Sequence, residues 1–164
     1  MLDYKEVMRE LGQANGSKAL RHCYERIERE ILSSDHYPSG AIEVFSSVLS
    51  DSSIFNRDDI SDFIFMMMSD MYAMSDSQKN KILELLCFNY SEYQVEKTCL
   101  IVCDAVARNY DSKRAFEALS NMLLSAKCIA GKRGAALGLD VVAKNSSGDA
   151  KLVGAIKSLL GRTS

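Results

Sequence analysis

The sequence has almost no proline, has no tryptophan, and shows no convincing stretch of the alternating apolar and polar residues that is typical of β-strands. One proline and no tryptophan occur in 164 residues. Proline interrupts helices because it lacks a backbone N–H and clashes with the preceding turn, so its scarcity favours long helices. Apolar residues recur at helical spacing almost throughout the chain. The pattern predicts an all-α protein.

Long hydrophobic runs are also missing. The most apolar stretches, residues 63–68 and 99–103, are far shorter than the roughly 20 residues of a membrane-spanning helix. Where a secretory leader has an apolar core, the first ten residues carry charges instead, at Asp3, Lys5, Glu6, Arg9 and Glu10. We therefore expect no membrane association and a cytoplasmic location.

The cysteines and histidines show no pattern of a disulfide framework, a metal site or a catalytic centre. Five cysteines are an odd number without paired spacing, which is typical of reduced thiols. Cys99 and Cys103 share a helix face, but a metal needs two further ligands, and apolar neighbours favour buried thiols. His22 and its neighbour Cys23 point about 100° apart on a helix and form no dyad, and His36 lies at a proline turn, so neither histidine indicates a catalytic site. No nucleotide-binding loop or nucleophile elbow occurs, so we expect no cofactor, no metal and no enzymatic activity.

Charge is distributed unevenly along the chain. The net charge of −2 divides into −1 for residues 1–35, −6 for residues 36–77 and +5 for residues 78–164. The middle segment contains one base, Arg57, against seven acids. Such an asymmetry carries information about binding partners and little about the fold.

The spacing of apolar residues predicts nine helices. Ser17 is expected to cap the second helix, Ser91–Gln94 has the form of a capping box that opens the sixth, and Gly131 separates the seventh from the eighth. The expected ranges are about 2–15, 17–33, 41–49, 56 or 58 to 74, 76 or 77 to 90, 91 onward, 111 or 112 to 130, 132–145, and 147 to 160.

One helix sequence occurs twice. Residues 136–145 (ALGLDVVAKN) repeat residues 100–109 (LIVCDAVARN) thirty-six positions later, so that Asp140 falls on Asp104. A fainter copy, residues 70–73, lies thirty-four positions upstream of the first. Self-similarity at this period is typical of stacked helical pairs, in which each pair buries its apolar face against a neighbour.

Residues 116–145 resemble a HEAT-type repeat: a leucine-rich first helix, a short turn, a basic residue and a small-residue second helix, which residues 133–139 match well. The resemblance implies a HEAT-like right-handed solenoid of about nine helices in antiparallel pairs. It further implies a single domain over 1–164, with its clearest repeats in 77–164 and atypical capping helices in 1–55.

The repeated aspartates sit on comparable edges of the two helix copies, each four residues before a base. In a solenoid the second helices line the concave side. We expect Asp104 to meet Lys144 and Arg108 to meet Asp140, as rungs between repeats. The alternative is a concave groove whose charges contact a partner.

The methionine-rich run at 63–68, with Met71 and Met74, is apolar around more than one helix face. Burial between neighbouring helices explains it; the alternative is an adaptable protein-binding surface, which the flanking acids favour. The candidate partner-binding residues are Asp58, Asp59, Asp62, Met66, Asp70, Met74, Asp76, Asp104 and Asp140.

In size and charge the chain is similar to small bacterial immunity proteins of the contact-dependent growth inhibition type. The resemblance implies a protein that acts as a monomer or in a 1:1 complex and neutralises a cognate toxin. A basic nuclease is expected, its cleft occluded by carboxylates of residues 51–76. One alternative is a nucleic-acid-binding protein that uses the basic C-terminal half, although the net charge and the lack of tryptophan count against it. A subunit of a larger complex is a third possibility.

Overall fold

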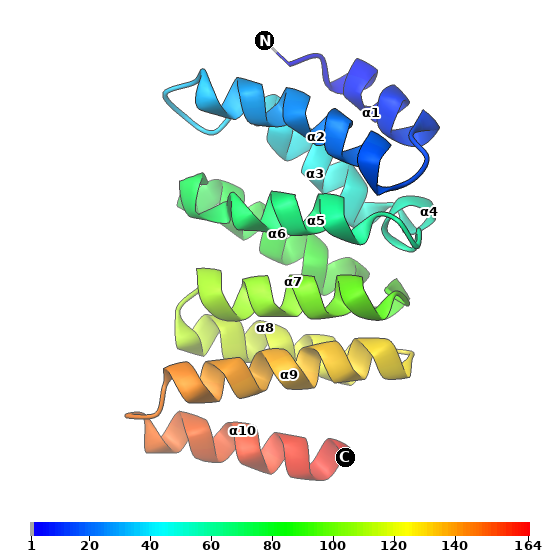
Figure 1. Ribbon diagram of the computed structural model, residues 1–164. Helices are drawn as coiled ribbons and strands as arrows, with labels where there is room; N and C mark the ends of the chain where they lie inside the picture. Colours follow the sequence, from blue (N-terminus) through cyan, green and yellow to red (C-terminus); the bar gives the residue numbers. More distant parts are fainter. Residues whose placement is uncertain (1) are drawn as a thin grey trace. The chain divides into compact units, whose positions relative to one another are not determined.

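All regular structure is helical in the computed structural model, which describes residues 2–164 (Figure 1), and the prediction of an all-α protein is confirmed. Ten α-helices and two 3₁₀-helices occur in this range. In order they are α1 (Tyr4–Gln13), α2 (Ser17–Leu32), α3 (Ser39–Ser50), α4 (Ser52–Phe55), α5 (Ser61–Ser69), η1 (Met71–Ala73), α6 (Asp76–Asn89), η2 (Tyr90–Glu92), α7 (Glu96–Asn109), α8 (Ser112–Ser125), α9 (Ile129–Asn145) and α10 (Ala150–Thr163).

The chain divides into two compact units, each with its own core. Unit 1 is Met1–Asn89 and unit 2 is Tyr90–Ser164. The division coincides with the change of charge: unit 1 has nine bases against fifteen acids, and unit 2 has eleven against seven. Unit 1 therefore carries a net −6 and unit 2 a net +4. A single domain over the whole chain stays a prediction.

Unit 1 is built around α3. Six of the twelve residues of this helix are buried, and it packs against α1, α4 and α6, while α2 packs against α5. Three aromatic rings join the layers: the ring of Tyr24 on α2 stacks with Phe45 on α3 at a centroid distance of 6.5 Å and meets Phe63 on α5 edge-on at 5.5 Å. Such pairs add about 0.5–1.5 kcal/mol to the burial of the rings themselves.

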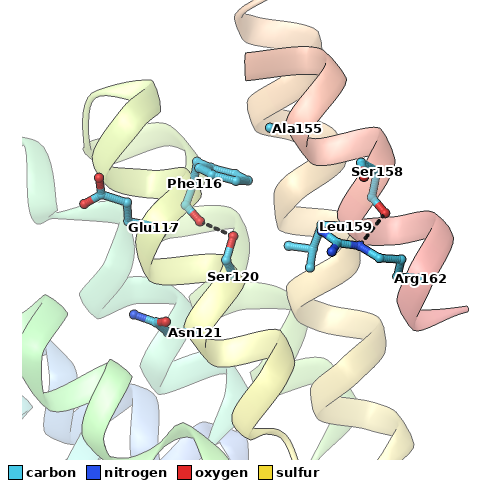
Figure 2. Close-up of a pocket in the computed structure, with 8 residues that line it drawn as sticks. All are labelled: Phe116, Glu117, Ser120, Asn121, Ala155, Ser158, Leu159 and Arg162. Atoms are coloured by element: carbon cyan, nitrogen blue, oxygen red, sulfur yellow. Dashed lines mark hydrogen bonds between the residues drawn. The ribbon is translucent and has the colours of Figure 1, made fainter. Parts of the chain in front are cut away.

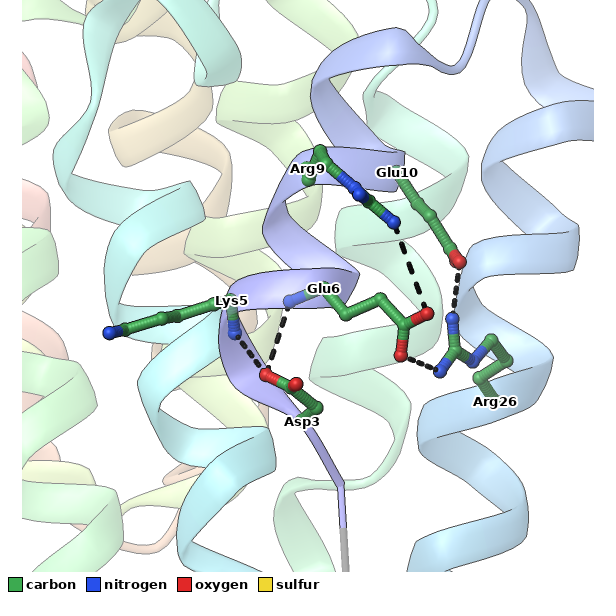
Figure 3. Close-up of polar contacts among 6 residues, drawn as sticks. All are labelled: Asp3, Lys5, Glu6, Arg9, Glu10 and Arg26. Atoms are coloured by element: carbon green, nitrogen blue, oxygen red, sulfur yellow. Dashed lines mark hydrogen bonds and ion pairs between the residues drawn. The ribbon is translucent and has the colours of Figure 1, made fainter.

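Ion pairs fasten α1 to α2 (Figure 3). The Arg26 guanidinium on α2 donates to the carboxylate of Glu6 at 2.8 Å and also to that of Glu10, one turn further along α1. These hydrogen bonds, with Glu6 first, raise the pKa of Arg26 above its ordinary value. One guanidinium thus binds two turns of the neighbouring helix, which fixes how α1 lies against α2.

The turn between α1 and α2 is held by residues that precede α5. The Arg57 guanidinium donates to the carbonyl oxygens of Leu11 (3.0 Å) and Ala14 (2.6 Å). Asp59 accepts a hydrogen bond from the backbone N–H of Gly16 at 2.8 Å. Gly16 has a φ of +85°, which a residue with a side chain rarely adopts. It also occupies the N-cap position of α2, where Ser17 was expected; that prediction is wrong.

The contact between α7 and α9 organises unit 2. Helix α8 also packs against α9 and runs antiparallel to it (Figure 1). Two glycines of α9, one turn apart, face α7. A Cβ atom at Gly134 would lie 2.9 Å from the backbone carbon and oxygen of Cys99, and one at Gly138 would lie 2.9 Å from Leu119 and 3.1 Å from Cys103. The backbones of α7 and α9 approach this closely only because both positions lack side chains.

A polar cluster lies beside this contact. The buried hydroxyl of Tyr90 donates to the carbonyl of Gly131 at 2.6 Å and accepts from the thiol of Cys103 at 3.1 Å. The Cys128 sulfur accepts from the N–H of Gly131 at 3.3 Å and caps α9. Burial, the largest cause, raises the pKa of the Cys99 thiol to about 11. All five cysteines are free thiols, and those of α7 pack as small apolar side chains.

Several predicted helix boundaries are wrong for identifiable reasons. Helix α9 begins at Ile129 and continues through Gly131, a buried residue at which a Cβ atom would lie 3.1 Å from the side chain of Ala126 and 3.7 Å from the Tyr90 ring, so this glycine does not end the preceding helix. Residues 90–92 form a 3₁₀ turn, so Ser91 does not open α7, which begins after Val95.

Further boundaries also shift. Helix α5 ends at Ser69 and not at Met74. A reciprocal pair of hydrogen bonds between Ser75 and Gln78 opens α6. Ser75 therefore caps this helix in place of the expected Asp76 or Ser77. Helix α10 is capped by Asp149 and runs through Gly161. Asp111, one of the two caps expected for α8, is confirmed: its carboxylate accepts from the N–H of Arg114 at 3.1 Å.

We expect Gly134→Ala to lower the free energy of unfolding by about 1–3 kcal/mol, because the added methyl group forces α7 and α9 apart. Gly154→Ala is the matched control, since nothing lies within 4 Å of a Cβ at this helical glycine. The control should be neutral or stabilising by up to about 1 kcal/mol. Urea denaturation measures both; equal stability of the two variants would contradict the close contact.

Candidate functional site

Helix α5 presents one face to the core of unit 1 and the other to solvent. Phe63, Ile64, Met67 and Met68 are buried, as are Met71 and Met74 beyond the helix, so burial accounts for most of the methionine-rich run. The opposite face exposes Asp62, Phe65 and Ser69, three and four residues apart. We call the exposed acidic and aromatic residues of this region the α5 surface: Asp58, Asp62, Phe65, Tyr72 and Asp76.

The α5 surface contains two large exposed rings. The Phe65 side chain is 57% exposed and that of Tyr72 is 78% exposed. Neither was among the residues expected from the sequence, because a run such as FIFMMM hides which of its members face outward. The signal lay in the polar neighbours: Asp62 and Ser69 share the face of Phe65, at i−3 and i+4.

Two of the expected site residues are largely committed to the fold. The Asp59 carboxylate accepts from the Arg57 guanidinium at 2.9 Å as well as from Gly16, and the hydrogen bond from Arg57 is the largest cause that holds the pKa of Asp59 below its ordinary value. Met74 is 6% exposed and therefore offers almost no surface to a partner. Met66 is half-buried.

Asp70 lies half-buried at the C-terminus of α5 and is bound by a tyrosine from α2. The Tyr24 hydroxyl lies within hydrogen-bond distance of the Asp70 carboxylate and of the Met66 carbonyl (3.0 Å), yet it has one proton to donate. Burial raises the pKa of Asp70, and the hydrogen bond from Tyr24 opposes that rise in part. The charge also raises the pKa of the buried Tyr37, after the effect of burial itself. Through this hydrogen bond, Asp70 joins the C-terminal end of α5 to Tyr24 of α2.

The remaining expected residues, Asp104 and Asp140, lie in unit 2 and form ion pairs within their own helices. Asp104 binds Arg108 at 2.9 Å and Asp140 binds Lys144 at 2.7 Å. The predicted rungs between Asp104 and Lys144 and between Arg108 and Asp140 are therefore wrong. A base four residues after an acid on one helix is already within reach.

Ion pairs between residues about thirty-six positions apart do exist, but they lie in or just before the N-terminal turns of α7 and α9. Arg133 donates to the carboxylate of Glu96 at 2.5 Å, and Lys127 pairs with Glu92. The hydrogen bond from Lys127, the largest cause, lowers the pKa of Glu92. The residues of these pairs are thirty-seven and thirty-five positions apart, which agrees with the period of the repeat.

No protein-family model matches the sequence, and neither the curated proteins nor the solved structures contain a match. Within residues 2–164, no helix combines the length and the apolar character that a membrane span needs. In the same range, no three His, Cys, Asp or Glu side chains are grouped so as to hold a metal ion.

The protonation of Asp70 gives a test of this geometry. Because its pKa is higher in the folded chain than the unfolded value of about 3.9, the stability contributed by the protonated carboxyl is lost as the pH rises through the two values. Asp70→Asn keeps an acceptor and adds a donor for Tyr24. We expect the variant to be more stable than the wild type at about pH 7, by a few tenths of a kcal/mol because the group is partly exposed.

The same comparison at about pH 3 supplies the control, since the wild-type carboxyl is then largely protonated and the advantage of Asn should vanish. Urea midpoints at both pH values give the measurement. A variant that is less stable than the wild type at neutral pH would show that the carboxylate charge itself supports the fold.

Proposed function

We propose that this protein binds a basic protein partner through the α5 surface. The observation that carries the proposal is the exposure of Phe65 and Tyr72 among the exposed carboxylates of Asp58, Asp62 and Asp76. Protein interfaces commonly have aromatic side chains at the centre and charged side chains at the rim. Exposed apolar patches with a polar rim are a common feature of protein-interaction sites.

The charge of unit 1 favours a basic partner. Its net −6 attracts positive surfaces and accelerates encounter. Nucleases expose positive charge because they bind phosphates. We propose that the partner is a bacterial nuclease toxin and that this chain is its immunity protein. In the complex the carboxylates of Asp58, Asp62 and Asp76 take the place of substrate phosphates, and the rings exclude water around them.

This mechanism needs no cofactor, no metal and no catalytic residue in the chain. Inhibition by occlusion requires a rigid acidic surface and one partner per binding site. The proposed state is therefore a monomer that forms a 1:1 complex in the cytoplasm. The partly buried Asp70, bound to Tyr24, contributes negative charge beneath the surface without contacting the partner itself.

We further propose that the helices form a HEAT-like right-handed solenoid of antiparallel pairs, within one domain. Support comes from unit 2, where residue pairs thirty-four to thirty-seven positions apart are in contact. Besides Glu92–Lys127 and Glu96–Arg133, the hydroxyls of Ser112 and Ser146 lie 2.6 Å apart. A contact that recurs at the sequence period is what stacked repeats produce.

Nucleic-acid binding is the competing function, because unit 2 has a net charge of +4. Four of its bases are paired with carboxylates: Arg108, Lys127, Arg133 and Lys144. A phosphate must displace these acids before it reaches the bases, which weakens this alternative. Retention of duplex DNA by the purified chain at about 150 mM salt would make the immunity proposal wrong.

We expect the wild-type chain to capture one basic protein from its source organism, and the gene of that protein to arrest growth unless this chain is co-expressed. Phe65→Ala and Tyr72→Ala should each weaken the complex about tenfold or more, as truncation of a central aromatic contact does. Calorimetric titration of the captured protein against the variants, together with growth rescue, measures the effect.

Phe88→Ala is the matched control, because Phe88 is an 85% exposed aromatic residue on α6 of the same unit. For charge, Asp58→Lys with Asp76→Lys should slow association, and Glu43→Lys, an exposed acid on α3, should leave it nearly unchanged. Binding that is lost equally in Phe88→Ala and in Phe65→Ala, or in none of the variants, would contradict the assignment of the α5 surface.

A further inference from the structure

A second surface, in unit 2, has the opposite character. An open groove of about 550 Å³ runs between α8 and α10 (Figure 2). Its apolar walls are Phe116 of α8 and Ala155 and Leu159 of α10, and in Figure 2 the side chains of Phe116 and Leu159 extend toward each other across it. Both helices run in the same direction (Figure 1), so the groove follows them lengthwise.

Two of the polar side chains in the groove bond to the backbone of their own helix. Ser120 donates its hydroxyl proton to the carbonyl of Phe116 at 2.6 Å, and Nε of Arg162 donates to the carbonyl of Ser158 at 3.3 Å. The apolar stripe of α8 continues one turn beyond Ser120 to Leu124, whose side chain is 68% exposed. Phe116, Ala155 and Leu159 are thus the apolar side chains of the groove, its other lining residues are polar, and Leu124 adds an exposed apolar side chain on α8 beyond it.

Its borders are basic. Arg162 lines the groove, Lys113 lies one turn before Glu117 on α8, and Lys151 lies one turn before Ala155 on α10. Among residues 2–164, none of these three bases has a carboxylate within ion-pair distance, in contrast to the four paired bases of unit 2 described above. Glu117 is the single acid in the groove. The border thus keeps a net positive charge that the chain does not neutralise.

We propose that this groove binds an acidic amphipathic helix of a protein partner. An apolar strip between two helices accepts the apolar face of a third helix, with anchors at i, i+3, i+4 and i+7. An extended peptide has no sheet edge to pair with, because the backbone groups of α8 and α10 are satisfied within each helix. Acidic residues on the flanks of the bound helix complement Lys113, Lys151 and Arg162. This surface is independent of the α5 surface.

The probe is a synthetic helical peptide of about 18 residues with leucine at i, i+3, i+4 and i+7 and glutamate on the flanking positions. Fluorescence anisotropy follows its binding to the full chain, and a scrambled peptide of the same composition is the control. We expect the amphipathic peptide to bind about tenfold more tightly than the scrambled one, and Lys151→Glu with Arg162→Glu to weaken it about tenfold.

Lys157→Glu is the matched control, because Lys157 is an exposed base on α10 that lies two residues after Ala155 and therefore on the other side of the helix from Ala155, Leu159 and Lys151; it should change binding less than about twofold. Ala155→Trp, at an exposed position, should abolish binding by filling the groove. Circular dichroism establishes that each variant is folded, and the charge variants alone decide the test if the tryptophan variant is not.

Three results would overturn the proposal. The first is no binding of the amphipathic peptide, or equal loss in Lys157→Glu and in the double variant, which would indicate general charge attraction. The second is competition by oligothymidylate with the same dependence on Lys151 and Arg162, which would indicate a phosphate site. The third is a concentration-dependent dimer of the free chain that Ala155→Trp abolishes, which would show that a second copy occupies the groove.

Discussion

Helix α9 can lie against α7 only because Gly134 and Gly138 lack side chains, and the arrangement of unit 2 follows from this contact. The close approach buries Cys99 and Cys103 as apolar groups and lets the Tyr90 hydroxyl reach the carbonyl of Gly131. It also brings the N-terminal turns of α7 and α9 near enough for Glu96 and Arg133 to form an ion pair. The close approach of the two backbones therefore determines where these polar contacts can form.

The acidic residues of unit 1 include some that hold the fold together and others that are exposed. Asp59 holds the α1–α2 turn with Arg57, and Asp70 is bound by Tyr24 from α2. Their charges are therefore fixed in place by the fold. The carboxylates of Asp58, Asp62 and Asp76 are exposed, and they lie close in the sequence to the exposed rings of Phe65 and Tyr72. The acidic segment of the sequence thus contains acids that hold the fold and acids that are exposed, and the proposed inhibitory function depends on the exposed ones.

The sequence predicted the helical class and the Asp111 cap, because apolar periodicity and local capping depend on neighbours in the chain. It did not predict that α9 continues through Gly131 or that Gly134 is a contact with α7, since both depend on tertiary packing. The repeat indicated contacts at a separation near thirty-six, but the rungs involve Glu96 and Arg133, because Asp104 and Asp140 already have bases on their own helices. Phe65 was missed because a uniformly apolar run contains no periodicity.

In the proposed complex the partner covers the α5 surface of unit 1. Hydrogen–deuterium exchange of the chain, free and in complex with the captured partner protein, tests this proposal. Exchange should slow in α5 and η1 (Ser61–Ser69 and Met71–Ala73) on complex formation, while α7 and α9 stay unchanged. Protection confined to α7 and α9, with none in α5 or η1, would contradict the account.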